Sequence, residues 1–296
     1  MLPSRFYTAL PGYQDASMPE LPEVEMVRRT LAPAVVGHVI EEVRVGSFTG
    51  VIGDMPPAMF SAATVGQTIA GIGRRGKYLV IHLSDDTAII VHLRMTGQLL
   101  VHQAADPPAR FQHLAVGLDG GAEIRFADQR KFGRVLHVST ELVDRLDRRL
   151  GPEPLAASFT ARRLAASLSR RPGKIKNVLL DQTVVAGLGN IYVDEALFRA
   201  RLHPLRSAQL LSMPEVQTLH RAIRSVLRQG LTHRGTTFSS YRDANGEGGG
   251  NQRHLSVYGR GGRGEPCDAC GAPLERLVVG GRGTHICPNC QTLADK

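Results

Sequence analysis

The first apolar pattern along the chain has helical spacing and follows Glu20 directly. Its apolar residues recur every three or four positions, and charged residues fill many of the positions between them. This spacing predicts an amphipathic helix that ends near Pro33 and Gly37. The apolar face of the predicted helix consists of Leu21, Val24, Val27 and Leu31.

Short apolar runs follow this helix, and Gly, Pro and Asp separate them. Runs of this kind are typical of strands in an antiparallel sandwich or barrel. The pattern stops at Gly151-Pro152-Glu153-Pro154, where we expect a domain boundary. The predicted strands are 39–45, 68–72, 78–83, 88–93, 114–118, 123–126 and 135–138.

Helical periodicity returns after this boundary, so the second half is expected to be mainly α-helical. Ahead of the third predicted helix, Gly187, Gly189 and Asn190 favour a double turn with Asn190 as the N-cap. Amides at such a helix start are suited to binding a phosphate. The glycine-rich segment 243–251 is typical of a loop. The predicted helices are 161–168, 175–180, 192–199 and 215–228.

All four cysteines lie near the end of the chain, in two Cys-x-x-Cys pairs. Their spacing fits the pattern of a zinc site, and two disulfides are the alternative. Four thiolates leave no open coordination position, so the predicted zinc ion is structural. The intervening segments 274–279 and 284–286 suit a β-hairpin whose turn carries Arg282. The predicted ligands are Cys267, Cys270, Cys287 and Cys290.

Composition and charge indicate a globular protein with an anionic partner. The 296 residues are enough for two domains, with 42% hydrophobic and 21% charged residues. No apolar run approaches the roughly 18 residues of a membrane span. The net charge of +9 indicates a polyanion, with nucleic acid first, and a solvated basic surface without a partner is the alternative.

The stretch Met18-Pro19-Glu20 contains candidate chemistry. If translation begins at Met18 and this methionine is removed, the ring nitrogen of Pro19 becomes a secondary amine that can attack a sugar carbon. Glu20 is then close enough to act as general acid or base. The alternative is an ordinary helix start, which proline and glutamate both favour. Any residue retained before Pro19 acylates the nitrogen, so we expect 1–17 to be a removable leader or a mis-assigned start.

Several further stretches occur in the order typical of one family. From Met18 to Gln291 the chain resembles formamidopyrimidine-DNA glycosylase, a family of 8-oxoguanine DNA glycosylases that also cleave abasic sites. The matching stretches are MPELPEVE at 18–25, RRGKYL at 74–79, HLRMTG at 92–97, RKFG at 130–133, GPEP at 151–154, VAGLGNIY at 185–192 and the four-cysteine finger.

The resemblance implies an α+β fold of three parts. An N-terminal antiparallel β-sandwich with flanking helices would span 18–151, and a helical helix-two-turn-helix domain would span 152–257. A zinc-finger β-hairpin would occupy 258–296, and 243–251 would form a lid over the flipped base. DNA would be held in the cleft between the two lobes.

The resemblance also implies catalytic roles for individual residues. Pro19 would attack C1′ of the damaged nucleotide, and Glu20 would transfer protons at the deoxyribose, with Glu23 in support. Lys77 would supply protons for β-elimination. Arg282 would hold the lesion phosphates and assist δ-elimination.

Further residues would contact the DNA. Met95 and Phe132 would fill the space left by the flipped base, and Arg130 would hydrogen-bond the orphaned cytosine. Core packing is the alternative for the two apolar residues, and a solvated charged face is the alternative for the basic ones. The expected backbone contacts are His92, Arg171, Lys176, Asn190 and Tyr258.

The implied function is base-excision repair of oxidised purines in double-stranded DNA, with β,δ-elimination and one structural Zn²⁺. We expect a monomer in the bacterial cytoplasm, associated with the nucleoid and not with a membrane. One alternative is an endonuclease VIII-like enzyme for oxidised pyrimidines. The other is a non-catalytic binder of damaged DNA, if the leader is retained.

Overall fold

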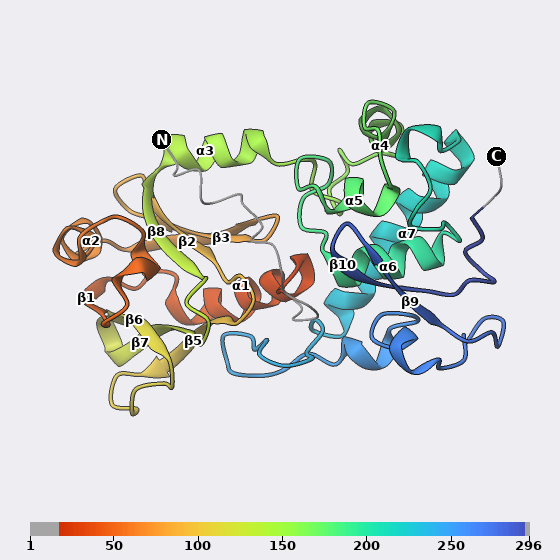
Figure 1. Ribbon diagram of the computed structural model, residues 1–296. Coiled ribbons are helices and arrows are strands. Elements are labelled where there is room, and N and C mark those ends of the chain that lie inside the picture. The colour runs from red at the N-terminus through yellow and green to blue at the C-terminus, as the bar shows by residue number, and fades with distance from the viewer. Residues whose placement is uncertain (1–17, 294–296) are drawn as a thin grey trace. The chain divides into compact units, whose positions relative to one another are not determined.

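A computed structural model of the protein describes residues 18–293 (Figure 1). The predicted leader 1–17 lies outside the described residues. The chain forms two compact units, and neither is continuous in sequence. The sandwich unit consists of Met18–Arg149 and Gly230–Gln252. The helical unit consists of Leu150–Gln229 and, among the described residues, 253–293.

The sandwich unit contains two four-stranded antiparallel sheets, so the predicted sandwich is confirmed. The first sheet has the order β1-β6-β7-β5, and the second has the order β2-β3-β4-β8. The strands are β1 (Ile40–Val45), β2 (Ile69–Arg75), β3 (Tyr78–Leu83), β4 (Thr87–His92), β5 (Gly97–Gln103), β6 (Gln112–Leu118), β7 (Ala122–Asp128) and β8 (Arg134–Ser139).

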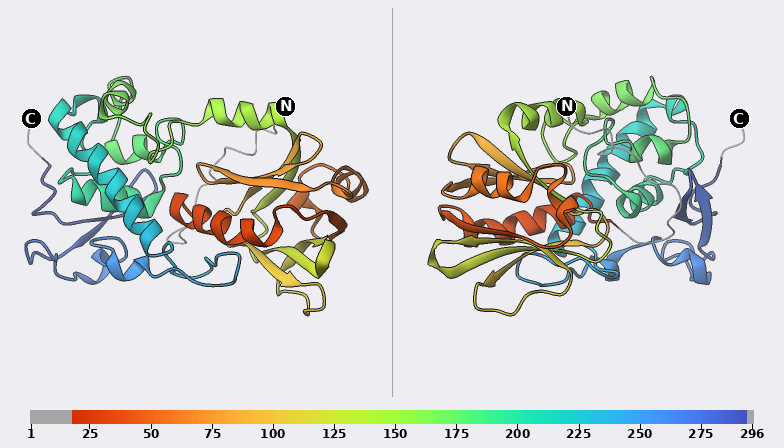
Figure 2. Two further views of the ribbon diagram at one scale, coloured as in Figure 1. Left: turned by 180° about the vertical axis from the view of Figure 1, so that it is seen from behind. Right: turned by 60° about the vertical axis from the view of Figure 1, so that its left-hand side comes forward.

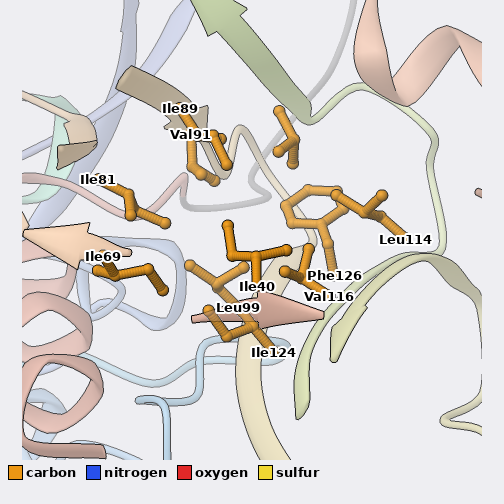
Figure 3. Close-up of a pocket in the computed structure, with 11 residues that line it drawn as sticks. Ile40, Ile69, Ile81, Ile89, Val91, Leu99, Leu114, Val116, Ile124 and Phe126 are labelled. Carbon is orange, nitrogen blue, oxygen red and sulfur yellow. The ribbon is translucent and has the colours of Figure 1, made fainter. Parts of the chain in front are cut away.

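The core of this unit lies between its sheets. Figure 3 shows isoleucine, leucine, valine and phenylalanine side chains from both sheets converging on one small apolar space. Alternate strand residues point to opposite faces, so each strand contributes its inward set to this core. Strand β5 was missed by the sequence analysis, because the doublet Leu99-Leu100 breaks the alternation. Its register is set by pairing with β7.

Helix α1 (Leu21–Val35) packs on the sandwich with all four predicted apolar residues buried. It passes Pro33 and ends two residues later. A proline in the last turn removes only one backbone donor, which explains why the helix does not stop there. Two further helices, α2 (Pro57–Thr64) and α3 (Thr140–Arg149), were not predicted.

The segment 230–252 belongs to the sandwich unit by its contacts, although we expected it to belong to the helical domain. The backbone N–H of Ala244 donates to Thr30 Oγ1 on α1 over 2.9 Å. The Ala244 carbonyl accepts the N–H of Val101 in β5 over 2.8 Å. The glycine-rich stretch is therefore tied to both a helix and a sheet.

The helical unit begins with the predicted helices α4 (Ala161–Leu168) and α5 (Ile175–Leu180), whose bounds are as expected. Helices α6 (Asn190–Arg199) and α7 (Met213–Thr232) follow, and the long α7 is clear in the left view of Figure 2. Strands β9 (Glu275–Val279) and β10 (Arg282–Ile286) form the antiparallel finger hairpin. Within the described residues, no helix has both the length and the apolar character needed to cross a bilayer.

Candidate functional site

The start of α1 holds Pro19 and Glu20 in a buried position. The backbone N–H of Glu20 donates to Glu23 Oε2 over 2.9 Å, an arrangement found in capping boxes. The other carboxylate oxygen, Oε1, accepts the backbone N–H of Thr236 over 2.7 Å. Glu23 therefore fixes the chain beside Pro19 against the segment 230–252.

Lys77 lies in the two-residue turn between β2 and β3, and only 6% of its surface is exposed. Gly76 takes a φ of 55° in this turn, a conformation that glycine adopts readily. Arg74 connects the turn to α1. Its Nη1 donates to the Gly76 carbonyl over 2.9 Å, and its Nε donates to Glu25 Oε2 over 3.1 Å.

His92 ends β4 and is buried. Burial lowers its pKa well below the usual range, and the nearby charges of Arg94 and Lys77 lower the pKa further. The backbone N–H of Arg94 donates to His92 Nδ1 over 3.0 Å. The ring is therefore neutral with its proton on Nε2, where it is a hydrogen-bond donor but not a cation.

The predicted void-filling side chains lie in two turns, and hydrogen bonds to Asp128 connect these turns. Met95 lies in the turn between β4 and β5, and Arg130 and Phe132 lie in the turn between β7 and β8. Thr96 Oγ1 donates to the buried Asp128, and the backbone N–H of Arg130 lies 3.1 Å from Asp128 Oδ1. The Arg130 guanidinium stacks over the Phe132 ring at 5.1 Å. Such stacking restricts both side chains before any ligand binds.

The four cysteines come together in the finger. Their sulfur atoms all lie within 4.8 Å of one another, with 4.0 Å between Cys267 and Cys290 and 3.4 Å between Cys270 and Cys287. Four thiolates around zinc at about 2.3 Å lie about 3.8 Å apart, whereas a disulfide requires about 2.05 Å. The thiols are free, so they form a zinc-binding site and the disulfide alternative is wrong.

Arg282 is the first residue of β10 and is exposed. The turn before it consists of Gly280 and Gly281, with φ values of 58° and 74°. Two positive φ values in a two-residue hairpin turn are typical of a type I′ turn. A Cβ at Gly280 would lie 2.2 Å from Asn177 Oδ1 on α5, so a larger residue would have to displace the Asn177 side chain and adopt an unfavourable positive φ.

Asn190 is not an N-cap, so that expectation is wrong. Gly189 occupies the N-cap position, and Asn190 is the first residue of α6. Its Nδ2 donates instead to the Gly283 carbonyl over 2.9 Å. Tertiary contact with the finger thus replaces local capping.

The backbone of the buried Tyr258 is held by a glutamate on α6. Glu195 on α6 accepts the backbone N–H groups of Ser256, Val257 and Tyr258 over 2.8 to 2.9 Å. Burial of Glu195 raises its pKa, and the three hydrogen bonds only partly offset this effect. The ring of Tyr258 meets the ring of His285 edge to face at 4.9 Å.

The two basic residues that we expected to contact the DNA backbone, Arg171 and Lys176, differ in solvent exposure. Arg171 is half-exposed, and its guanidinium donates to Asp181 Oδ2 over 2.5 Å and to Thr183 Oγ1 over 2.8 Å. Lys176 is fully buried at 0% exposure, with its ammonium 2.6 Å from Asp194 Oδ1. A solvated face is therefore wrong for Lys176, and this ammonium is not at the surface.

The sequence pattern does not single out the carboxylates that position these groups, which are the buried Asp128, Asp194 and Glu195 and the part-buried Glu25. One signal was present in the sequence, because Asp194 and Glu195 interrupt an otherwise apolar stretch of a predicted helix. Buried carboxylates require partners, and such an interruption indicates a positioning role.

Three family models match the chain in succession. The formamidopyrimidine-DNA glycosylase N-terminal domain matches residues 18–135, and the formamidopyrimidine-DNA glycosylase H2TH domain matches 150–242. A zinc finger found in FPG and IleRS matches 264–293. The matches cover both units.

Similar proteins and structures agree with these matches. The formamidopyrimidine-DNA glycosylase of Herpetosiphon aurantiacus is 51% identical over 274 residues, which cover 93% of this chain and 100% of that protein. The formamidopyrimidine-DNA glycosylase of Pelotomaculum thermopropionicum is 46% identical over 276 residues, which cover 93% of this chain and 99% of that protein. A Lactococcus lactis FPG mutant in complex with Fapy-dG containing DNA has a TM-score of 0.86, 38% identity, and 93% and 100% coverage. The MutM (FPG) protein from Thermus thermophilus has a TM-score of 0.83, 40% identity, and 94% and 100% coverage.

Proposed function

Because the chain belongs to the formamidopyrimidine-DNA glycosylase family, we propose that it excises oxidised purines from double-stranded DNA and then cleaves the strand. The substrates are 8-oxoguanine and formamidopyrimidines. The observation that carries this proposal is the start of α1. There Pro19 and Glu20 are buried together, and Glu23 holds the adjoining backbone through both of its carboxylate oxygens.

The reaction begins at the Pro19 nitrogen, once residues 1–18 are absent and the nitrogen is a secondary amine. Its lone pair attacks C1′, and the electrons of the bond between C1′ and the base leave with the base, which takes up a proton. Glu20 transfers protons at the deoxyribose ring. The opened sugar then carries an iminium on the Pro19 nitrogen, and this charge needs no protonation to persist.

The iminium makes the C2′ proton acidic, which allows elimination. Removal of this proton expels the 3′ phosphate, with Lys77 supplying protons, and a second elimination expels the 5′ phosphate. Arg282, from the finger, holds the lesion phosphates and assists this second step. Water then hydrolyses the iminium, which releases the sugar remnant as an unsaturated aldehyde and restores the Pro19 amine. The products are the free base, this aldehyde and a one-nucleotide gap with phosphate at both edges.

The damaged nucleotide must leave the helix first, at a cost of about a few kcal/mol. Met95 and Phe132 fill the vacated space, and Arg130 hydrogen-bonds the orphaned cytosine. The stacking of Arg130 on Phe132 supports this role, because both side chains are already aligned at the tip of one turn. Apolar wedges at a base step are a common device of DNA-bending proteins.

His92, Arg171, Asn190 and Tyr258 contact the backbone phosphates. His92 acts as a neutral donor, so its contribution does not depend on its own protonation near pH 7. The four cysteines would hold zinc, which would supply structure and not catalysis, since four thiolates would fill its coordination sphere. We further propose that the enzyme acts as a monomer in the bacterial cytoplasm, on nucleoid DNA.

The experiment that tests this function compares two forms of the protein, one that begins at Pro19 and one that begins at Met1. Each is mixed with a duplex containing 8-oxoguanine opposite cytosine and treated with borohydride. We expect covalent trapping only with the Pro19-initiated form, because an acylated nitrogen cannot form an iminium. The variant Pro33→Ala, at the other end of α1, is the control and should trap normally.

Two outcomes would favour the alternatives. Preferential excision of thymine glycol would support an endonuclease VIII-like activity. An intact mass of the native protein that includes residues 1–17, together with DNA binding and no trapping, would support a non-catalytic binder.

A further inference from the structure

Lys176 is a basic residue of α5 that lies completely inside the helical unit. Its ammonium donates to three oxygens: Asp194 Oδ1 over 2.6 Å, Thr284 Oγ1 over 2.7 Å and the Gly283 carbonyl over 3.0 Å. These acceptors match the three N–H bonds of an ammonium group. Two of the three belong to strand β10 of the finger.

Asp194, the partner on α6, is equally buried at 1% exposure. One carboxylate oxygen accepts the Lys176 ammonium, and the other accepts the backbone N–H of His285 over 2.9 Å. The pair therefore holds three consecutive residues of β10, Gly283, Thr284 and His285. Figure 1 shows β10 drawn close to α6, in agreement with these bonds.

This geometry does not suit a DNA ligand. A lysine ammonium must reach the surface to contact a phosphate, and withdrawing Lys176 would leave Asp194 as a buried carboxylate without its lysine partner. Breaking a buried ion pair by removing one partner is strongly unfavourable. The ammonium is therefore committed to the interior of the unit.

The zinc site and the ion pair fix different parts of the hairpin, in addition to the bond from Asn190 to the Gly283 carbonyl. Zinc holds Cys287, which follows β10, whereas the ion pair holds residues 283–285 within the strand. Arg282 is the residue directly before this segment. Without the ion pair, residues 283–285 would lose three hydrogen bonds to α5 and α6 and keep the bond from Asn190 Nδ2 to the Gly283 carbonyl, so the tip of the hairpin would be held less firmly.

We propose that Lys176 and Asp194 are positioning residues that lock the finger hairpin, and with it Arg282, for the second elimination. This inference rests on the role given to Arg282 above. It assigns Lys176 to the interior of the protein and not to the DNA-contacting surface.

The test uses two substitutions that change the charge in opposite directions, Lys176→Met and Asp194→Asn. A positioning role predicts the same defect in both. On DNA with an abasic site we expect the ratio of δ- to β-elimination product to fall about tenfold or more, while covalent trapping changes less than about twofold. Zinc should remain at one ion per chain, and amide exchange over 276–284 should accelerate about tenfold.

Matched controls remove the same charges from the surface of the unit. Lys174→Met, two residues before Lys176, and Glu275→Gln, on strand β9, alter exposed side chains, and both should behave like the unsubstituted protein. The double variant Lys176→Met with Asp194→Leu replaces the ion pair by apolar groups, which cores commonly tolerate. It should fold even if the single variants do not, and its hairpin should still exchange rapidly.

A phosphate-contacting Lys176 gives the opposite pattern. Lys176→Met would then weaken DNA binding and reduce the salt slope by about one, and Asp194→Asn would leave the product ratio unchanged. That result would overturn the proposal. Absence of δ-product from the unsubstituted enzyme would instead refute the role of Arg282, and the exchange measurement would still decide whether the pair locks the hairpin.

Discussion

Glu25 illustrates how one part-buried carboxylate can connect several arginines around α1. It accepts hydrogen bonds from Arg28, Arg29 and Arg74, and its side chain is 12% exposed. Burial raises its pKa, but the hydrogen bonds from Arg28 and Arg29 and the charges of Arg28 and Arg74 together lower the pKa to about 2. Because Arg74 also holds the turn that carries Lys77, this carboxylate connects α1 to that turn.

The charge of Glu25 should stabilise the fold in a pH-dependent way. Its pKa is lower in the folded than in the unfolded protein, so the stabilisation is present above about pH 4.5 and is lost as the pH falls towards 2. We expect Glu25→Gln to reduce stability at pH 7 by up to about 3 kcal/mol, and much less at pH 2.

Denaturant midpoints of the two proteins at pH 7, 4 and 2 would measure this difference. Glu41→Gln, an exposed carboxylate of β1, is the control. A constant difference between Glu25→Gln and the unsubstituted protein across this range would contradict the assignment of the shift to Glu25.

At the scale of the element, α1 begins two residues after Pro19, the proposed nucleophile. Glu23 accepts one backbone N–H from Glu20 and one from Thr236, so each oxygen has its own donor. A glutamine in its place keeps only one acceptor oxygen and directs an N–H₂ group at the other donor. The start of α1 therefore depends on a carboxylate and not only on a residue of similar size.

We expect Glu23→Gln to destabilise the start of α1 by about 1–3 kcal/mol, because one buried backbone N–H loses its partner. Covalent trapping on abasic-site DNA should slow about tenfold or more as Pro19 loses its fixed position. Single-turnover trapping rates for Glu23→Gln and Glu41→Gln would test this expectation. Equal rates would mean that the contact with Thr236 is dispensable.

At the scale of the whole molecule, the two units have separate cores and each draws on distant parts of the chain. The finger adds a small cluster of its own around Val257, Leu274 and two of the cysteines. So small a cluster cannot hold a fold without a metal, as in other small zinc modules. The basic charge of +9 belongs to the whole chain and favours any nucleic acid.

Removal of zinc should therefore unfold the finger and spare the sandwich unit. We expect chelation, or Cys267→Ser, to weaken binding to abasic-site DNA about tenfold or more, because Arg282 and Tyr258 lose their support. Amide exchange should rise over 264–291 and stay unchanged over β1 to β8. Unchanged affinity after loss of zinc would contradict the structural role of the finger, and restored affinity on adding zinc would exclude irreversible damage.

The elements predicted most accurately are those whose signal lies within a few residues. The periodicity of 161–168 and 175–180 gave α4 and α5 with their bounds, and the cysteine spacing gave the metal site. Strand β5 was missed because its register comes from β7 and not from its own alternation. The prediction that Asn190 is the N-cap of α6 was wrong for a similar reason, because its side chain donates to the Gly283 carbonyl of the finger instead.

The sequence by itself determined the family and the metal site, because the order of the motifs and the spacing of the four cysteines can be identified from residue types alone. The role proposed for Pro19 follows from that family resemblance and not from local spacing. Only the tertiary structure decided which charged residues face solvent and which lie inside. Burial of Lys176 and Asp194, and partial burial of Glu25, results from contacts between segments that are far apart in sequence, and no local pattern encodes such contacts.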